Sequence, residues 1–304
     1  MSVYKVDVLL ATYNGQDFIA EQIDSVLSQQ GVCVRIFVRD DGSTDATLNI
    51  IDEYRARYPD SVFLVEDDVA HCGAMHNFFY LMREISSADY FSFCDQDDVW
   101  FSDKLRIAVA GLEAAGSGPR LYCSAVDYVD SSLHLIGNSS RPTYPAFNNA
   151  LAENIAQGCT MVFDASLRKL IVERIPEGAT IHDWWTYLVA SAFGTVIYDP
   201  EPRLQYRQHG GNVVGGGFSF WQKWQKRYRR FISGNAWKMA AQAEELLRLY
   251  PDMLTPAQKD LIHYFVAGKK SYLARLRFLF GRRVWRQSSY ETLVIKFLVL
   301  INAY

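Results

Sequence analysis

The chain has 304 residues, enough for one large α/β domain and a smaller appendage. Hydrophobic residues make up 49% and charged residues 21%, a globular composition that excludes a disordered or collagen-like chain. The net charge of −3 hides an asymmetry: residues 1–219 carry 15 Lys and Arg against 29 Asp and Glu, whereas residues 220–304 carry 16 against 5. This split indicates two regions with different tasks, one of them facing an anionic surface.

The five cysteines are widely spaced and form no CxxC pair or Cys/His cluster with the spacing of a zinc site. Their odd number favours a reduced protein with buried thiols over a disulfide framework. Residues 1–5 lead directly into an apolar strand pattern, so no secretory signal is expected. Together these features predict a cytoplasmic protein.

The first part of the chain alternates apolar runs with segments of helical periodicity. Strands are predicted over 6–11, 34–38, 62–65 and 90–94, and helices over 17–30, 46–58 and 74–86. Ser43 or Thr44 is available as the N-cap of the helix over 46–58. This alternation predicts an α/β fold with βαβ units, in which helices flank a Rossmann-like, mostly parallel sheet.

Later segments complete the predicted domain and open a second region. Strand-like runs cover 121–130, 157–163 and 194–198, a loop covers 137–149, and a helix covers 182–193. A glycine-rich hinge over 210–217 places a boundary near residue 219, between an α/β domain (1–219) and a basic, aromatic-rich helical region (220–304). Helices in that region are predicted over 221–232, 236–250, 256–280 and 290–303.

Polar clusters follow three of the predicted strands, at 12–14, 40–41 and 95–98. Ligands of parallel sheets lie beyond the carboxyl ends of the strands. We therefore expect the three clusters to converge on one crevice.

Asp95 and Asp97 lie two positions apart after a predicted strand, and Asp98 adds a third carboxylate. Carboxylates in this arrangement suit Mg²⁺ or Mn²⁺, which bind through one or two of them and through substrate phosphates. The alternative is a solvated acidic turn.

Asp40 and Asp41 are followed by Gly42, Ser43 and Thr44, which alone would indicate a capping turn. Capping explains a serine or threonine but not two consecutive carboxylates at a strand end. A carboxylate can accept the imide N–H of uracil or thymine, and its neighbour can hold a ribose hydroxyl.

Taken together, these motifs resemble glycosyltransferase family 2, the inverting enzymes of the GT-A fold. The resemblance covers about residues 3–215 and says nothing about 220–304. The matching segments are VLLATYN at 8–14, RDDGSTD at 39–45, GAMHN at 73–77, DQDDVW at 95–100 with Lys104 and Leu105, HDWW at 182–185 and YRQHGGN at 206–212.

The resemblance implies a nucleotide-binding set and a cation site. The nucleotide-binding residues would be Thr12, Tyr13, Asn14, Asp40, Asp41 and Asp95. Asp97 would bind the metal directly, with Asp95 reaching the ribose or the metal's shell and His209 completing the site; an incidental loop histidine is the alternative. The motif reads Asp-Gln-Asp-Asp, which leaves the role of Asp98 open.

Asp183 matches the catalytic base of the family, which takes the proton of the acceptor hydroxyl as its oxygen attacks the anomeric carbon. As a residue that begins a predicted helix it would otherwise be an N-cap, and the two roles are compatible because a helix N-terminus favours a carboxylate. Trp184, Trp185, Gly158 and Trp100 are candidates for the sugar or acceptor pocket, although one of the adjacent tryptophans is expected in the core.

The combination of motifs resembles the rhamnosyltransferase branch of the family, which uses dTDP-L-rhamnose to build bacterial surface polysaccharides such as O-antigen. A UDP-hexose or UDP-N-acetylhexosamine donor is the alternative. The acceptor is expected to be a saccharide or a lipid-linked saccharide. Remote alternatives are a nucleotidyltransferase, which would need a glycine-rich phosphate loop after the first strand, and a nucleotide-sugar-binding module.

The helical region 220–304 interleaves basic residues with aromatic and aliphatic ones. Helices of this kind fit an anionic membrane surface, which would make the protein peripheral on the inner face of the cytoplasmic membrane. Residues 293–301 are too few to span a bilayer. Nucleic-acid binding is not expected because no accompanying motif is present, whereas packing on the α/β domain or a homodimer contact remain alternatives.

Overall fold

The computed structural model describes residues 3–67, 69, 71–139, 142, 145–208 and 238–304. The chain forms two compact units that alternate along the sequence. The first comprises Met1–Arg141, Ala156–Glu173 and Thr195–Gly217, and the second Pro142–Ile155, Arg174–Gly194 and Phe218–Tyr304. The boundary predicted near residue 219 and the helix predicted over 221–232 lie outside the described residues and stay predictions.

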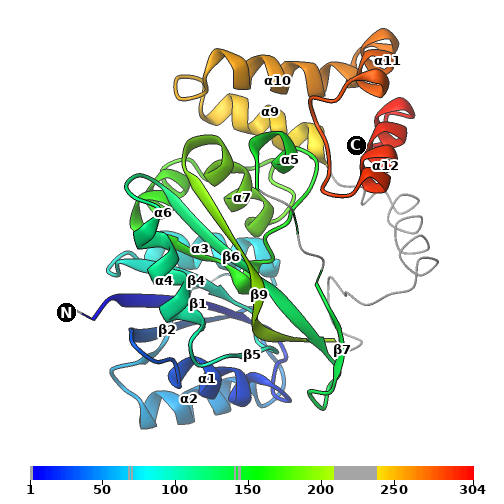
Figure 1. Cartoon of the computed structure of the whole chain (residues 1–304). Helices are drawn as coiled ribbons and strands as arrows, with labels where there is room; N and C mark the ends of the chain where they lie inside the picture. Colours follow the sequence, from blue (N-terminus) through cyan, green and yellow to red (C-terminus); the bar gives the residue numbers. More distant parts are fainter. Residues whose placement is uncertain (1–2, 68, 70, 140–141, 143–144, 209–237) are drawn as a thin grey trace. The chain divides into compact units, whose positions relative to one another are not determined.

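The first unit is built on a nine-stranded sheet (Figure 1). In order across the sheet the strands are β3 (Val62–Leu64), β2 (Cys33–Asp40), β1 (Lys5–Thr12), β4 (Tyr90–Cys94), β8 (Val162–Asp164), β6 (Arg120–Val129), β9 (Thr195–Arg207) and β5 (Val99–Trp100), while β7 (Leu135–Asn138) pairs with β6.

The half of the sheet formed by β3, β2, β1 and β4 is parallel, as the sequence predicts. Strand β1 is central in this half, and its residues 6–10 are buried on both faces, which is why they read as a continuous apolar run. The register pairs Thr12 with Asp40 and Leu10 with Cys94, so the polar residues that follow these strands emerge at one edge.

The other half of the sheet is mixed rather than parallel. Strand β8 runs antiparallel to both β4 and β6, β9 runs parallel to β6, and the two-residue β5 runs antiparallel to β9. Strand β9 continues nine residues past the predicted end at Tyr198, across Pro200 and Pro202, where register shifts against β6 accommodate the prolines. Prolines normally end a strand pattern, which is why the sequence suggests too short a strand.

Helices flank the sheet of the first unit; in Figure 1, α1 and α2 lie on one side of β1 and β2, and α3 and α6 lie on the other. Their bounds are α1 (Ile19–Leu27), α2 (Thr47–Arg57), α3 (Gly73–Glu84), α4 (Lys104–Ala114) and α6 (Ala165–Val172). The N-cap expected at Ser43 or Thr44 is wrong, because α2 begins three residues later with Ala46 at its cap. Helices α4 and α6 were not among the predicted elements.

The described elements of the second unit are helical. They are α5 (Phe147–Ala150), α7 (His182–Phe193), α9 (Met239–Leu249), α10 (Pro256–Val266), α11 (Tyr272–Phe280) and α12 (Ser289–Leu300). Helix α10 begins with a capping box between Thr255 and Gln258. The long helix expected over 256–280 is interrupted after Val266, where Tyr304 donates a hydrogen bond to the carbonyl of Phe265 (2.7 Å) and its hydroxyl approaches too near to Gly268 to leave room for a Cβ.

Candidate nucleotide and cation site

The polar residues after β1, β2 and β4 meet at one edge of the sheet, as expected from their positions. The amide N–H of Asp41 donates to the carbonyl of Thr12 (2.9 Å), which joins the first two strand ends. Gln96 joins the third: its Oε1 accepts hydrogen bonds from the Thr12 hydroxyl (2.6 Å) and the Tyr13 N–H (2.8 Å), and its Nε2 donates to the Tyr13 carbonyl (3.1 Å). These contacts confirm the predicted convergence.

Gly15 allows the Gln96 side chain to approach the β1 loop. A Cβ at position 15 would lie 2.5 Å from Gln96 Oε1, closer than any side chain tolerates. The N–H of Gly15 donates to the hydroxyl of Thr47 at the start of α2 (2.8 Å), which holds the loop in place. The glycine after the first strand is therefore required by a close approach.

Asp40 and Asn14 shape the loops at the strand ends. The Asp40 carboxylate accepts hydrogen bonds from the N–H groups of Gly42 (3.0 Å) and Ser43 (2.7 Å). Asn14 has a positive φ of 49°, and its Oδ1 accepts from the N–H of Thr44 (2.8 Å). Both polar side chains thus already bind the protein's own backbone.

Tyr13 and Asn14 are the exposed members of the set, and Tyr13 carries the aromatic ring. Its side chain is 48% exposed, and its ring meets the edge of the His71 ring at a centroid distance of 5.7 Å. Exposed aromatic rings next to polar loops offer a flat apolar surface on which a base can stack.

Asp41 binds the N-terminus of α3. Its carboxylate accepts hydrogen bonds from the N–H groups of Cys72 and Gly73 (both 2.9 Å). Burial by itself would raise the pKa of Asp41, but these two N–H groups, the Cys72 thiol and the nearby Arg39 outweigh it and lower the pKa. Asp41 is therefore held as an anion at this edge.

The acidic run after β4 divides into partly exposed and buried carboxylates. Asp95 and Asp97 are half-buried, whereas Asp98 is 1% exposed and its Oδ1 accepts a hydrogen bond from the N–H of Arg207 (3.1 Å). Burial and the like charges of Asp97 and Asp95 raise the pKa of Asp98 well above its usual range. Asp98, whose role the sequence leaves open, is thus an interior contact between the acidic run and the end of β9.

The residues around the run fit a hard cation. One ligand atom each from Asp95, Asp98 and Cys159 lies within 4.8 Å of the others. Burial and the neighbouring carboxylates raise the pKa of Cys159 well above its usual range, so the sulfur is a thiol rather than a thiolate. The carboxylates of Asp95 and Asp98 remain as oxygen atoms of the kind that Mg²⁺ and Mn²⁺ prefer. Asp97 does not belong to this cluster, and its role as a ligand stays a prediction. His209 lies outside the described residues, and its role stays a prediction.

A buried lysine lies beneath this run, and its environment was not foreseen from the sequence. Lys104 is fully buried, with its Nζ 3.3 Å from the Ser92 hydroxyl and 3.1 Å from the centroid of the Trp100 ring. Burial lowers the pKa of Lys104 to about 7, although Cys94, Cys159 and Asp98 favour its charged form.

Arg207 joins the end of β9 to the acidic run and to α1. Its Nε donates to the carbonyl of Asp97 (2.9 Å), one terminal nitrogen donates to the carbonyl of Ser131 (2.5 Å), and the other pairs with Glu21. The guanidinium also lies over the ring of Phe18, 4.7 Å from its centroid. Arg207 is 2% exposed, and it precedes His209 by two residues, so it fixes where the chain leaves the sheet.

Asp183 belongs to the second unit. It lies in the first turn of α7 rather than at the N-cap, which is Ile181, and its carboxylate accepts a hydrogen bond from the N–H of Trp184 (2.6 Å). The side chain is half-buried. A carboxylate in the first turn of a helix is stabilised as an anion.

The four residues suggested for the sugar or acceptor pocket are all buried. Trp184 and Trp185 are 3% and 0% exposed within the second unit, and the indole N–H of Trp184 donates to the carbonyl of Ala150 (2.7 Å). In the first unit, Trp100 is 3% exposed in the core beside Lys104, and Gly158 opens a buried 3-10 turn. Their described contacts are interior ones, and the pocket role stays a prediction.

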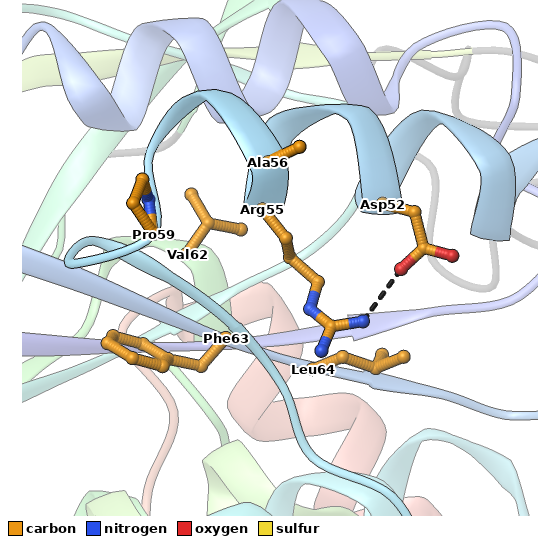
Figure 2. Close-up of a pocket in the computed structure, with 7 residues that line it drawn as sticks. All are labelled: Asp52, Arg55, Ala56, Pro59, Val62, Phe63 and Leu64. Atoms are coloured by element: carbon orange, nitrogen blue, oxygen red, sulfur yellow. Dashed lines mark hydrogen bonds and ion pairs between the residues drawn. The ribbon is translucent and has the colours of Figure 1, made fainter.

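A hollow of about 380 Å³ lies elsewhere on the first unit, between α2 and β3 (Figure 2). Its walls include Arg55, which pairs with Asp52 at 2.7 Å, and the side chains of Val62, Phe63 and Leu64. It lies at the edge strand of the sheet and shares no residue with the candidate site. We assign it no part in the chemistry.

The first prediction concerns Arg207. We expect Arg207→Lys to lower the free energy of unfolding by about 2–4 kcal/mol, because a lysine cannot make the three hydrogen bonds of the buried guanidinium. The control is Arg203→Lys on the same strand, whose side chain is 19% exposed and pairs with Asp199. Urea unfolding measures the free energy of unfolding of both variants. An equal loss of stability in the two would contradict the conclusion that the hydrogen bonds of Arg207 hold the end of β9 to the acidic run.

Comparison with known proteins agrees with this geometry. The family model described as glycosyl transferase family 2 matches residues 7–173. The dTDP-rhamnosyl transferase RfbG of Shigella flexneri is 32% identical over 228 residues, which are 71% of this chain and 77% of that protein. A putative glycosyltransferase of Bacillus subtilis, EpsE, is 35% identical over 109 residues, covering 36% of this chain and 38% of its own length.

Two solved structures share the fold at 18% identity. Staphylococcus aureus TarS in complex with UDP-GlcNAc superimposes with a TM-score of 0.61, over 98% of this chain and 79% of that one. The mannosyltransferase PcManGT of Pyrobaculum calidifontis, in complex with GDP-Man and Mn²⁺, gives a TM-score of 0.54 over 100% and 82%. The expected GT-A architecture with C-terminal helices is confirmed, and the chain is a glycosyltransferase that belongs to glycosyltransferase family 2.

Proposed function

We propose that the enzyme transfers L-rhamnose from dTDP-L-rhamnose, with inversion, to a saccharide or lipid-linked saccharide acceptor in the synthesis of a bacterial surface polysaccharide. The observation that carries the proposal is the 32% identity, over 228 residues and 71% of this chain, to a dTDP-rhamnosyl transferase. UDP-hexose and UDP-N-acetylhexosamine donors are the alternative. The UDP-GlcNAc of TarS supports them weakly, because 18% identity carries the fold alone.

The strand-end residues are proposed to bind the nucleoside. The exposed ring of Tyr13 offers a stacking surface for thymine, and the anionic Asp41 is suited to accept the imide N–H of the base. Thr12, Asn14 and Asp40 shape the loop through the hydrogen bonds described above. Their part in nucleotide binding is therefore to hold the backbone that meets the ligand.

A divalent cation, Mn²⁺ or Mg²⁺, is proposed to be held by Asp97 and Asp95 with His209. When bound, the cation would stabilise the negative charge of the departing diphosphate. The half-buried positions of Asp95 and Asp97 support this assignment, since both carboxylates remain accessible, whereas the buried Asp98 binds the backbone of Arg207. We therefore give Asp98 the role of orienting the run.

Asp183 is proposed as the general base. Its position in the first turn of α7 favours the ionised carboxylate, the form that accepts a proton from the acceptor hydroxyl. The developing alkoxide oxygen would then attack the anomeric carbon from the face opposite the nucleotide, which inverts the configuration.

The donor assignment is tested by comparing dTDP-L-rhamnose, UDP-glucose, UDP-galactose and UDP-N-acetylglucosamine as substrates for donor hydrolysis in the presence of Mn²⁺. We expect dTDP-L-rhamnose to be preferred by at least about 100-fold in kcat/KM, the discrimination that several lost contacts produce. A preference for a UDP sugar would exclude the rhamnosyl assignment and leave membership of the family unaffected.

Replacement of Asp183 and replacement of Asp97 are predicted to change different kinetic and binding constants. Asp183→Asn should lower kcat by roughly 10³-fold or more while donor affinity stays unchanged, because the amide cannot accept the proton. Asp97→Ala should lower kcat and also weaken Mn²⁺-dependent donor binding. Transfer assays combined with calorimetric titration of dTDP distinguish the two patterns. Asp252→Asn, an exposed carboxylate of the second unit, is the control; near-normal turnover of either test variant would remove the role given to that residue.

A further inference from the structure

Helix α12 is apolar on both of its sides. Ile295 and Val299 are fully buried, whereas Leu293, Phe297 and Ile301, at spacings of four residues, are 64%, 55% and 44% exposed. A helix that is hydrophobic all round is normally buried on all sides. We therefore expect the exposed stripe of Leu293, Phe297 and Ile301 to be covered by a binding partner.

Helix α11 packs against α12 and exposes apolar side chains of its own (Figure 1). Leu273 and Phe280, seven residues apart, are 76% and 82% exposed, and Tyr272 is 63% exposed. We call these side chains the α11–α12 surface; its members are Tyr272, Leu273, Phe280, Leu293, Phe297 and Ile301. Several large exposed apolar side chains on two helices that pack together are typical of interaction sites.

The same part of the chain is strongly basic. Residues 267–304 contain eight Lys and Arg and one acidic residue, Glu291. Arg286 pairs with Glu291, and Arg283 pairs with Asp260 of α10. No ion pair to a carboxylate of the described residues forms at the remaining cations of helices α11 and α12 and their connection, which are Arg275, Arg277, Arg282 and Lys296.

The positive charge and the exposed apolar side chains together indicate which kind of partner fits this surface. A second copy of the chain would bring two surfaces of the same positive sign together, which is unfavourable. A nucleic acid would satisfy the cations but would leave aliphatic side chains such as Leu293 and Ile301 without an apolar environment. The interface of a bilayer with anionic lipids satisfies both, since the apolar side chains enter the acyl boundary and the cations meet the head groups.

We propose that the α11–α12 surface docks the enzyme on anionic lipid bilayers. The proposed contact is interfacial because it uses the exposed side chains of α11 and α12. Within the described ranges, no helix is long and apolar enough to cross a membrane. Leu273, Phe280, Leu293 and Phe297 provide the inserted side chains, and Arg277, Arg282 and Lys296 bind the lipid head groups. This docking depends on side chains of the second unit and not on the identity of the donor sugar. Membrane docking would bring the enzyme to a lipid-linked acceptor.

Co-sedimentation of the full-length protein with vesicles tests this docking. We expect binding to vesicles of phosphatidylcholine with 30% phosphatidylglycerol, weak binding to pure phosphatidylcholine, and a loss of binding as salt rises. Leu293→Ser combined with Phe297→Ser should weaken vesicle binding at least tenfold, and Arg277→Gln combined with Arg282→Gln should weaken it and reduce its salt dependence.

The matched control is Leu135→Ser combined with Ile136→Ser, which removes two exposed apolar side chains (62% and 49%) from β7 in the first unit. It should bind vesicles like the wild type, and urea unfolding should show that the variants remain folded.

The proposal is overturned if the wild type does not bind anionic vesicles, or if the α12 variant binds as well as the control. It is also overturned if the α12 variant turns a dimer into a monomer without changing vesicle binding, or if the cations bind nucleic acid in preference to lipid. Donor hydrolysis by the α12 variant should equal that of the wild type, which separates this proposal from the proposed function.

Discussion

The side-chain amide of Gln96 is the contact on which the candidate site depends. It bonds both the N–H and the carbonyl of Tyr13 and accepts from the Thr12 hydroxyl, so the loop after β4 is held against the loop after β1 as another strand would be. From the opposite side, Arg207 bonds the backbone of Asp97 and presents its own N–H to Asp98. The acidic run is thus held by hydrogen bonds from Gln96 to the loop after β1 and from Arg207 at the end of β9.

The carboxylates of the acidic run differ in how deeply they are buried. Asp95 and Asp97 are half-buried, whereas Asp98 is buried and accepts a hydrogen bond from the backbone of Arg207. The neighbours of Asp98 include Cys159, and Asp98 is near enough to Lys104 to favour the charged form of that lysine. The Asp-Gln-Asp-Asp run therefore combines the two proposed metal ligands with Gln96, which binds the loop after β1, and Asp98, which binds the end of β9.

The local sequence pattern predicted the parallel half of the sheet and the meeting of its strand ends, because β1, β2 and β4 are short, mainly apolar segments whose ends must share an edge. It could not predict what holds the site together. The partners of Gln96 lie more than 80 residues away in sequence and those of Arg207 up to 186, so neither residue has a local signature. Strand β9 was underestimated for a local reason, since its prolines normally end a strand.

Calorimetric titration of dTDP in the presence of Mn²⁺ measures most directly whether Gln96 holds the proposed nucleotide-binding loops together. Gln96→Met keeps the length of the side chain but leaves the Tyr13 N–H and the Thr12 hydroxyl without their acceptor, so dTDP affinity should fall by about 10-fold or more. The exposed Gln30→Met provides the comparison and should bind dTDP like the wild type. Unchanged dTDP affinity in a folded Gln96→Met protein would contradict the account.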